Sequence, residues 1–200
     1  MKSTSRELAG DDGNDLNLDR VVSAALQMIE RVGVDQMTMR MLADHLGCSP
    51  MATYRYVKSK DALLELAADA VLSSVKIPQQ SEGSWDERLA MVSRSVWDEM
   101  WGHSWIPGFV IRRSQTTRAQ SSQQRRIAQA VQEILEEAGF GAAEGRTAFG
   151  FYWAFTTGML LSGGIGGVSL GSDPTRNRRV KETFKFGLDA MIAGLKSQLP

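Results

Sequence analysis

The chain has few of the residues that enzymes, metalloproteins and secreted proteins depend on. Its 200 residues include one cysteine, Cys48, and two histidines, His45 and His103. A single cysteine excludes an intrachain disulfide, and the Cys and His spacings of structural zinc sites are absent. No acid–base or nucleophilic constellation stands out. We therefore expect neither an enzyme nor a metal site, and no cofactor.

An excess of charge of one sign is also missing. The 23 basic residues balance the 23 acidic ones, so any binding of nucleic acid has to be local. Residues 1–19 are polar and contain no apolar core segment, unlike a signal peptide, so a cytoplasmic location is expected. Residues 147–172 carry no charge, but seven of them are glycine and six are Ser or Thr, which disfavours a membrane span.

Apolar residues recur at helical spacing, which predicts an all-α fold of about nine helices. The hydrophobic content of 42% suits a globular core. Residues 105–108, with a Pro-Gly pair, are read as a turn before a short helix. The expected helices are 18–32, 38–46, 49–57, 59–75, 85–101, 109–115, 119–138, 144–161 and 175–195.

Residues 38–60 read as two short helices joined by a tight turn and followed by a third helix. Thr38 can cap the first helix, and Gly47 suits a positive φ in the turn. Ser49 can cap the second helix, with Pro50 at its first position. This order is typical of a helix-turn-helix, whose second helix enters the DNA major groove.

The charge of this stretch favours the same function. Residues 36–60 contain four basic side chains and one acid, Asp44. Arginine and lysine make charge-assisted contacts with phosphates, and tyrosine hydroxyls can also donate to them. A solvated face of an ordinary helical protein would explain the charge count alone, but not the capping and turn pattern with it.

These elements occur in the order and at the distances found in one known family. In chain order they are LDRVVSAALQMIERVG, TMRMLADHLG, CSPMATYRYV and KSKDALL. The run of residues 18–68 resembles the DNA-binding domain of the Tet repressor family. The resemblance covers about a quarter of the chain.

This resemblance implies a domain plan and partners. It implies a flexible arm at residues 1–16, a helix-turn-helix DNA-binding domain at 17–62 with its motif at about 38–57, and an effector-binding and dimerisation domain at 63–200. The expected partners are a double-stranded DNA operator, a small-molecule effector and a second copy of the chain. The homodimer would form through the last two long helices, at about 144–161 and 175–195.

The family pattern also assigns roles to single residues of the head. Base edges would face Arg40, Pro50, Met51 and Ala52, while phosphates would be held by Thr38, Tyr54, Tyr56 and Lys60. Arg55 can do either, and Ser49 caps the recognition helix. Since Met51 and Ala52 offer only apolar contact, thymine methyl groups are their expected partners.

A ligand site between the middle helices is a further implication of the resemblance. Its candidate residues are Trp97, Met100, Trp101, His103, Trp105, Phe109, Phe149, Trp153 and Met159, although such a residue, taken singly, is more often structural than part of a ligand site. An aromatic lining suits a flat or lipophilic ligand. Five arginines between residues 101 and 132, without an acid, are either solvated or a counter-charge for an anionic effector: Arg112, Arg113, Arg118, Arg125 and Arg126.

The expected function is that of a sequence-specific DNA-binding transcriptional regulator. The family default is a repressor that a small lipophilic or aromatic ligand releases from a near-palindromic operator. The alternative is a helical protein–protein adaptor that keeps the fold without specific DNA binding. It would lack the steep salt dependence that phosphate contacts give to duplex affinity.

Overall fold

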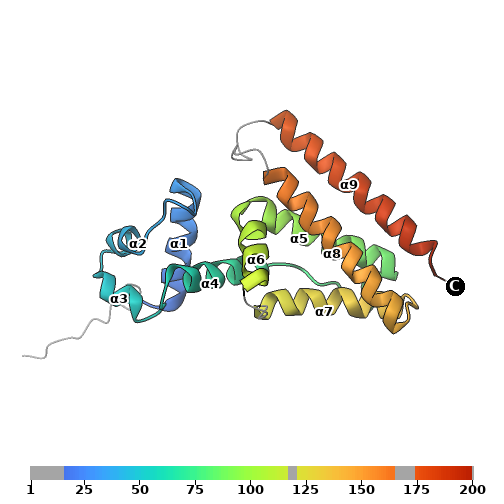
Figure 1. Ribbon diagram of the computed structural model, residues 1–200, viewed down its shortest axis with the longest axis horizontal. Coiled ribbons are helices and arrows are strands. Elements are labelled where there is room, and N and C mark those ends of the chain that lie inside the picture. The colour runs from blue at the N-terminus through green and yellow to red at the C-terminus, as the bar shows by residue number, and fades with distance from the viewer. Residues whose placement is uncertain (1–15, 117–120, 165–173, 200) are drawn as a thin grey trace, which may run out of the picture. The chain divides into compact units, whose positions relative to one another are not determined.

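The computed structural model describes residues 16–116, 121–164 and 174–199, without side-chain detail for 113–116, 162–164 and 174–177. The expected arm at 1–16 thus lies almost wholly outside the described residues. The described part contains no strand, and its helices are α1 (Leu18–Val32), α2 (Met39–Leu46), α3 (Pro50–Tyr54), α4 (Lys60–Ser73), a 3₁₀ turn η1 (Gln80–Glu82), α5 (Trp85–Trp101), α6 (Trp105–Thr116), α7 (Ser122–Glu137), α8 (Ala142–Gly164) and α9 (Pro174–Lys196) (Figure 1). The all-α prediction is confirmed.

Local signals explain most of the helix ends. The side chain of Asn17 accepts the backbone N–H of Arg20 and starts α1, which Gly33 ends with a positive φ of 85°. Ser59 caps α4 by accepting from the N–H of Ala62 at 3.1 Å. Such caps satisfy amides that have no partner inside the helix.

The start of α6 corrects the sequence reading. We expected a turn at residues 105–108 and a helix from 109, but the helix begins at Trp105. Pro107 is its third residue, so the N–H that proline lacks falls in the first turn, where amides have no intrahelical partner. The prediction that the Pro-Gly pair would interrupt the helix was therefore wrong.

The chain divides into two compact units, residues 1–67 and 68–200. The division lies inside α4, the helix in which the sequence analysis put a boundary at residues 62–63. In the first unit α2 packs against both α1 and α3. Its core is aliphatic and methionine-rich, and includes Val21, Ala25, Met28, Met37, Leu42 and Leu63, each at most 1% exposed.

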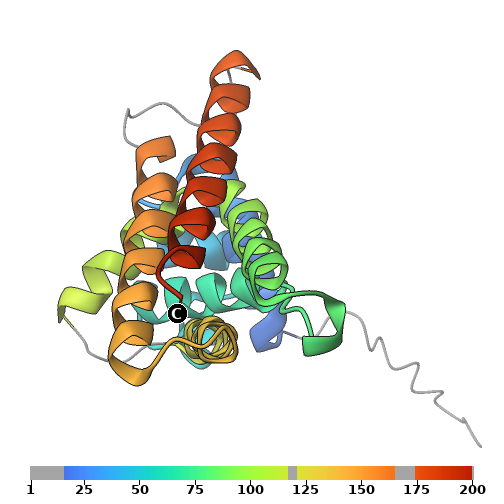
Figure 2. The ribbon, with the colours of Figure 1, turned by 90° about the vertical axis from the view of Figure 1, so that its right-hand side faces the viewer.

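In the second unit α5 packs against α7, α8 and α9, and α8 also contacts α6, α7 and α9. Figures 1 and 2 show α8 and α9 running side by side. Aromatic stacking joins α5 to α9, since the ring of Trp97 lies 4.1 Å from that of Phe184. The buried Arg88 of α5 forms an ion pair with Glu137 of α7 and so joins these two helices.

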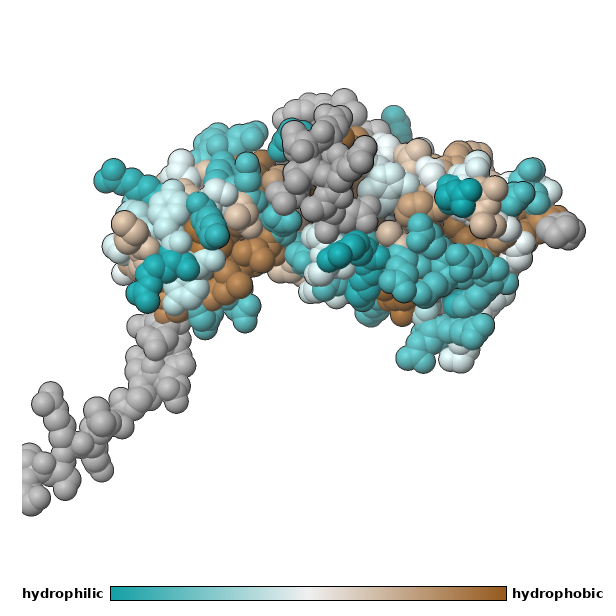
Figure 3. Space-filling view, turned by 60° about the horizontal axis from the view of Figure 1, so that its bottom comes forward, coloured by the Kyte–Doolittle hydropathy of each residue, from teal (hydrophilic) through white to brown (hydrophobic). Residues whose placement is uncertain are grey.

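The outer side of α7 is hydrophilic. Figure 3 shows polar residues gathered over this part of the second unit. They include the exposed side chains of Arg125, Gln129, Gln132, Glu133 and Glu136. The opposite side of the helix is buried, with Ile127, Val131 and Leu135 at most 6% exposed. α7 is thus an ordinary amphipathic surface helix of this unit.

Candidate nucleic-acid interface and ligand site

The helix-turn-helix geometry is built by caps at each joint. The hydroxyl of Thr38 accepts from the N–H of Met41 at 3.2 Å, and that of Ser49 accepts from the N–H of Ala52 at 3.3 Å. Between them Gly47 adopts the left-handed region at φ 67°, which glycine enters without steric cost. Both capping hydroxyls keep their proton, so each can still donate to a phosphate.

The short helix α3 has one packed side and one open side. Thr53 is fully buried, and its hydroxyl donates to the carbonyl of Pro50 at 2.7 Å. Exposed fractions on the open side are 74% for Met51 and 46% for Tyr54, and Arg55 is also exposed. Although Thr53 is polar, its neighbours bury it, and it takes no part in the open side of the helix.

The basic side chains expected at this surface lie open to solvent. Arg40 on α2, Arg55 at the end of α3, and Lys58 are all exposed. In the sequence Arg40 precedes the exposed Met51 and Tyr54, and the other two basic residues follow them. Asp44 is the one acidic residue between residues 36 and 60. A surface with cationic, hydroxyl and apolar groups suits both phosphates and base edges.

Two residues expected to hold phosphates also have partners within the first unit. Tyr56 donates its hydroxyl proton to the carbonyl of Leu16, just before α1. The ammonium of Lys60 donates to the carbonyl of Asp35 at 3.3 Å. Lys60 keeps further protons for another acceptor, whereas Tyr56 gives a proton to a phosphate only by releasing Leu16. These contacts join residues far apart in sequence, so no local pattern revealed them.

The structure separates the candidate ligand residues into inner and outer groups. Trp97, Met100 and Phe109 are buried, and Trp153 is 36% exposed on α8. Five others are half-buried: Trp101, His103, Trp105, Phe149 and Met159. Trp97 and Trp101 form one tilted pair with ring centres 4.8 Å apart, and Trp105 meets Phe109 edge-on at 5.9 Å. Trp153 stacks on Phe149 at 6.5 Å.

The sequence reading missed three buried polar side chains in the second unit. Ser93 of α5 is fully buried, and Tyr152 and Thr156 of α8 are 2% and 5% exposed. Burial raises the pKa of the Tyr152 hydroxyl, and hydrogen bonding with the neighbouring Ser93 and Thr156 hydroxyls lowers it by less. In the sequence Tyr152 and Thr156 stand inside the uncharged run of residues 147–172, and only their spacing of four residues indicated a shared face of α8.

Part of the arginine-rich stretch has a structural role. Arg126 donates to three carbonyls at the end of α4, those of Leu72 at 3.1 Å, Ser73 at 3.3 Å and Val75 at 3.0 Å. A guanidinium is well suited to this position, because carbonyls at a helix C-terminus lack intrahelical donors. The side chains of Arg113 and Arg118 lie outside the described residues.

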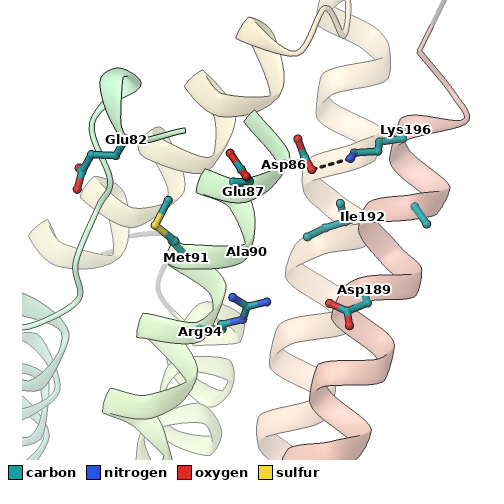
Figure 4. Close-up of a pocket in the computed structure, with 10 residues that line it drawn as sticks. Glu82, Asp86, Glu87, Ala90, Met91, Arg94, Asp189, Ile192 and Lys196 are labelled. Atoms are coloured by element: carbon teal, nitrogen blue, oxygen red, sulfur yellow. Dashed lines mark ion pairs between the residues drawn. The ribbon is translucent and has the colours of Figure 1, made fainter. Parts of the chain in front are cut away.

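A cleft of about 540 Å³ lies between α5 and α9 (Figure 4). Its acids already have partners. Asp86 pairs with Lys196 at 2.6 Å, which lowers the pKa of Asp86, and Glu87 accepts from the backbone N–H of Ser84 at 2.9 Å. These acids therefore have structural roles: Asp86 links α5 to α9, and Glu87 caps the start of α5.

The described residues hold no cluster of three or more His, Cys, Asp or Glu side chains placed to bind a metal. None of the helices described has the length and apolarity needed to cross a membrane.

Comparison with known sequences identifies the first unit. Residues 21–67 match the family described as "Bacterial regulatory proteins, tetR family". A relative from Saccharopolyspora erythraea, an HTH-type transcriptional regulator, is 37% identical over 90 residues, which is 45% of this chain and 38% of that protein. The chain thus spans well under half the length of this relative.

A longer match reaches into the second unit. The tetracycline repressor protein class A from transposon 1721 of Escherichia coli is 32% identical over 149 residues, covering 73% of this chain and 66% of that protein.

Solved structures share this fold over most of the chain. A possible TetR family transcriptional regulator from Streptomyces coelicolor aligns with a TM-score of 0.77 at 24% identity, over 90% of this chain and 99% of its own. BioQ with its double-stranded DNA operator aligns at 0.73 and 23% identity, over 92% and 100%. The Streptomyces coelicolor protein ActR in complex with actinorhodin aligns at 0.72 and 23%, over 92% and 98%. Together, the head geometry, the matched domain and the shared fold show that this chain belongs to the Tet repressor family of transcriptional regulators.

Proposed function

We propose that the protein is a sequence-specific DNA-binding transcriptional regulator, and that it acts as a repressor released by a small lipophilic or aromatic ligand. The observation that carries the proposal is the open side of α3, where Met51, Tyr54 and Arg55 are exposed beside Arg40 of α2. Buried Thr53 and capping Ser49 hold this helix in place. A regulator of this kind works in the cytoplasm, where its operator lies.

The domain roles and DNA contacts follow from the family's arrangement. Residues 17–62 would bind DNA, with Arg40, Pro50, Met51 and Ala52 at base edges and Thr38, Tyr54, Tyr56 and Lys60 at phosphates. The solved complex of BioQ with its operator supports DNA as the partner, and that of ActR with actinorhodin supports a small-molecule effector. Residues 63–200 would bind the effector and the second subunit.

A homodimer through α8 and α9 is part of the proposal. These two helices carry large apolar side chains at the surface: Phe151 is 54% exposed, Trp153 36% and Phe186 77%. Exposed aromatics on neighbouring helices favour a protein partner. A dimer also places two recognition helices on two half-sites, about 34–36 Å apart, which a near-palindromic operator requires.

The test is selection of bound sequences from a random duplex pool by the purified protein, repeated with Tyr54→Ala and Arg40→Ala. We expect a near-palindromic sequence from the unaltered protein and loss of enrichment in both variants. Asp98→Ala, a change at an exposed residue of α5, is the matched control and should select the same sequence. Recovery of no preferred sequence would reject the regulator and leave the helical adaptor.

A further inference from the structure

Three exposed basic side chains of the first unit have no acidic partner there. Arg40, Arg55 and Lys58 lie open to solvent, and none of them forms an ion pair within the described part of the chain. Asp44 is the one acid between residues 36 and 60. These three side chains form a basic face with unbalanced positive charge, which attracts an acidic segment that can reach it.

An acidic segment is attached directly beside the basic face. Residues 7–15 contain no basic residue and four acids: Glu7, Asp11, Asp12 and Asp15. They precede Leu16, whose backbone carbonyl accepts the hydroxyl proton of Tyr56. Tyr56 stands in the chain between Arg55 and Lys58. This hydrogen bond therefore holds the residue that follows the acidic segment next to the end of the recognition helix α3.

The segment is long enough to lie along the whole recognition helix. An extended chain spans at most about 3.4 Å per residue, so Asp12 lies within about 14 Å of Leu16, and Glu7 within about 31 Å. The helix α3 has five residues, and its axis therefore rises by only about 7.5 Å. From the attachment beside Tyr56, the acids have the reach to meet each basic side chain near α3.

The attachment allows weak charge contacts to hold the segment in place. Two groups joined by a short flexible chain meet at an effective concentration in the millimolar range. A segment that binds weakly as a separate peptide therefore occupies the face for much of the time when it is tethered. Residues 7–15 include few apolar side chains, Leu8 and Ala9, so the contacts are mainly electrostatic and readily reversed.

We infer that residues 7–15 cover the basic face beside α3 in the absence of DNA and compete with the duplex for it, so that this segment is an autoinhibitory element. The inference rests on the proposed function and adds a regulation of its DNA-binding surface. A duplex displaces the segment, because it carries one phosphate charge per about 1.7 Å of its axis. Four carboxylates spread over nine residues are a much sparser array.

A direct contact with DNA is the other role open to such a segment, and its charge argues against that role. Arms that enter the minor groove carry arginine or lysine, which the negative potential of the groove attracts. Residues 1–15 contain two basic residues, Lys2 and Arg6, against four acids. The carboxylates are repelled by phosphates and attracted by the basic face of the protein.

The cover has a predictable effect on affinity. If it is present in about 70–90% of the molecules, only about 10–30% are free to bind, which weakens the apparent affinity by about three- to tenfold. The factor is the same for every duplex sequence, because the segment reads no base. Salt screens charges over about 10 Å at 0.1 M and about 3 Å at 1 M, so the effect fades as the ionic strength rises.

The first measurement detects the cover in the full chain without DNA. A carbodiimide joins a carboxylate to an amine in contact with it, and Lys58 offers the amine on the basic face. Mass spectrometry should find Lys58 joined to acids of residues 7–15 at about 0.05 M salt and much less of this product at about 1 M. Lys181, exposed on α9, is the internal control. Equal joining to both lysines, or a yield that salt leaves unchanged, would overturn the inference.

The second measurement is the affinity for a fluorescein-labelled duplex of random sequence, followed by fluorescence anisotropy. The variant Glu7→Gln/Asp11→Asn/Asp12→Asn removes three of the four acids. At about 0.05 M salt it should bind about three- to tenfold more tightly than the unaltered protein. It should also select the same sequence from a random pool. Unchanged or weaker binding, or a different selected sequence, would show that the segment does not inhibit in this way.

The matched control removes three acids from the second unit, and so makes the same change in net charge. Asp98→Asn/Glu133→Gln/Glu136→Gln alters exposed residues of α5 and α7 and should bind the duplex like the unaltered protein. A gain in affinity equal to that of the first variant would attribute the effect to net charge and overturn the inference. If no protein binds any duplex, the proposed function fails, and the Lys58 cross-link by itself decides whether the segment covers the basic face.

Discussion

Gly187 shows how one absent side chain sets the spacing of two helices. A Cβ atom on this residue of α9 would lie 2.5 Å and 2.8 Å from two ring carbons of Phe155 on α8. These separations are shorter than any van der Waals contact between carbons. The Phe155 ring also stacks towards Phe184, so it is not free to withdraw. The glycine thus lets the ring enter the space beside α9.

We expect Gly187→Ala to lower the free energy of unfolding by about 1–2 kcal/mol, because the usual cost of about 1–3 kcal/mol for forcing an added carbon into a packed core exceeds the gain of about 0.5–1 kcal/mol from alanine as the better helix former. Urea denaturation followed by circular dichroism measures it. The matched control is Gly194→Ala on the same helix, where an added Cβ meets nothing within 4 Å. That change should raise stability by about 0.5–1 kcal/mol, because alanine is the better helix former. Equal effects of the two substitutions would contradict this account of Phe155.

Helices α4 and α7 are locked together at their ends by reciprocal contacts. The carboxylate of Asp69 on α4 accepts from the Ser122 hydroxyl at 2.8 Å and from the Gln123 N–H at 3.1 Å, at the start of α7. In return Arg126 of α7 donates to the last carbonyls of α4. Each charge sits at the helix end whose dipole favours it.

Arg126→Met should lower the free energy of unfolding by about 1.5–3 kcal/mol, since hydrogen bonds from a charged donor are stronger than neutral ones and the carbonyls would lose their donor. Arg125→Met, at the exposed neighbouring position, should change it by no more than about 0.5 kcal/mol. Chemical denaturation of both variants gives the comparison. If Arg125→Met were as destabilising as Arg126→Met, the hydrogen bonds from Arg126 to the carbonyls at the end of α4 would have no special role in stability.

The ion pair between Asp86 of α5 and Lys196 of α9 predicts a dependence of stability on pH. The Lys196 ammonium lowers the pKa of Asp86 below its ordinary value. The contribution is therefore fully present above the unfolded-state pKa, about 4, and is lost as the pH falls through the lower folded-state pKa. Asp86→Asn should be less stable than the unaltered protein at pH 7.

The difference between the two proteins should shrink when unfolding is measured at pH 3 and below. Lys196→Met at pH 7 serves as the companion variant, because it removes the same pair from the other side. A stability gap that stays constant between pH 7 and the acid range would show that Asp86 acts through something other than its charge.

At the scale of the whole molecule, the exposed aromatic side chains of α8 and α9 offer a test of the proposed homodimer. Phe186 is 77% exposed on α9, and under the proposed function a partner subunit covers it. We expect Phe186→Glu to yield monomers in sedimentation velocity at micromolar concentration, because a buried unpaired carboxylate opposes association. Operator affinity should fall with it, since a monomer reads only one half-site.

Met91→Glu is the control for added charge at an exposed apolar residue. Met91 is 36% exposed on α5, outside the proposed dimer helices, so this variant should sediment like the unaltered protein. A dimer that persists in Phe186→Glu would refute the proposed interface. A unit that no longer unfolds cooperatively would instead reveal a structural role for Phe186, which its exposure argues against.

The sequence by itself determined the helical class, the helix-turn-helix and most helix ends. These depend on interactions between residues within a few positions, such as the Thr38 and Ser49 caps, the positive φ of Gly47 and the apolar spacing of α1. The same local rules failed at Trp105, where a Pro-Gly pair looked like a break but lay in a first turn that tolerates it.

Only the tertiary structure decided which polar groups are buried and what they meet. Tyr56 reaches Leu16 across 40 residues, and Arg126 reaches Val75 across 51. Tyr152 and Thr156 read as parts of an apolar helix until α5 was packed against them. Burial depends on which helix faces which, and contacts between distant residues leave no periodic trace in the chain. For that reason the sequence indicated a ligand site between the middle helices, while only the fold showed which of its candidate residues are buried and which are partly exposed.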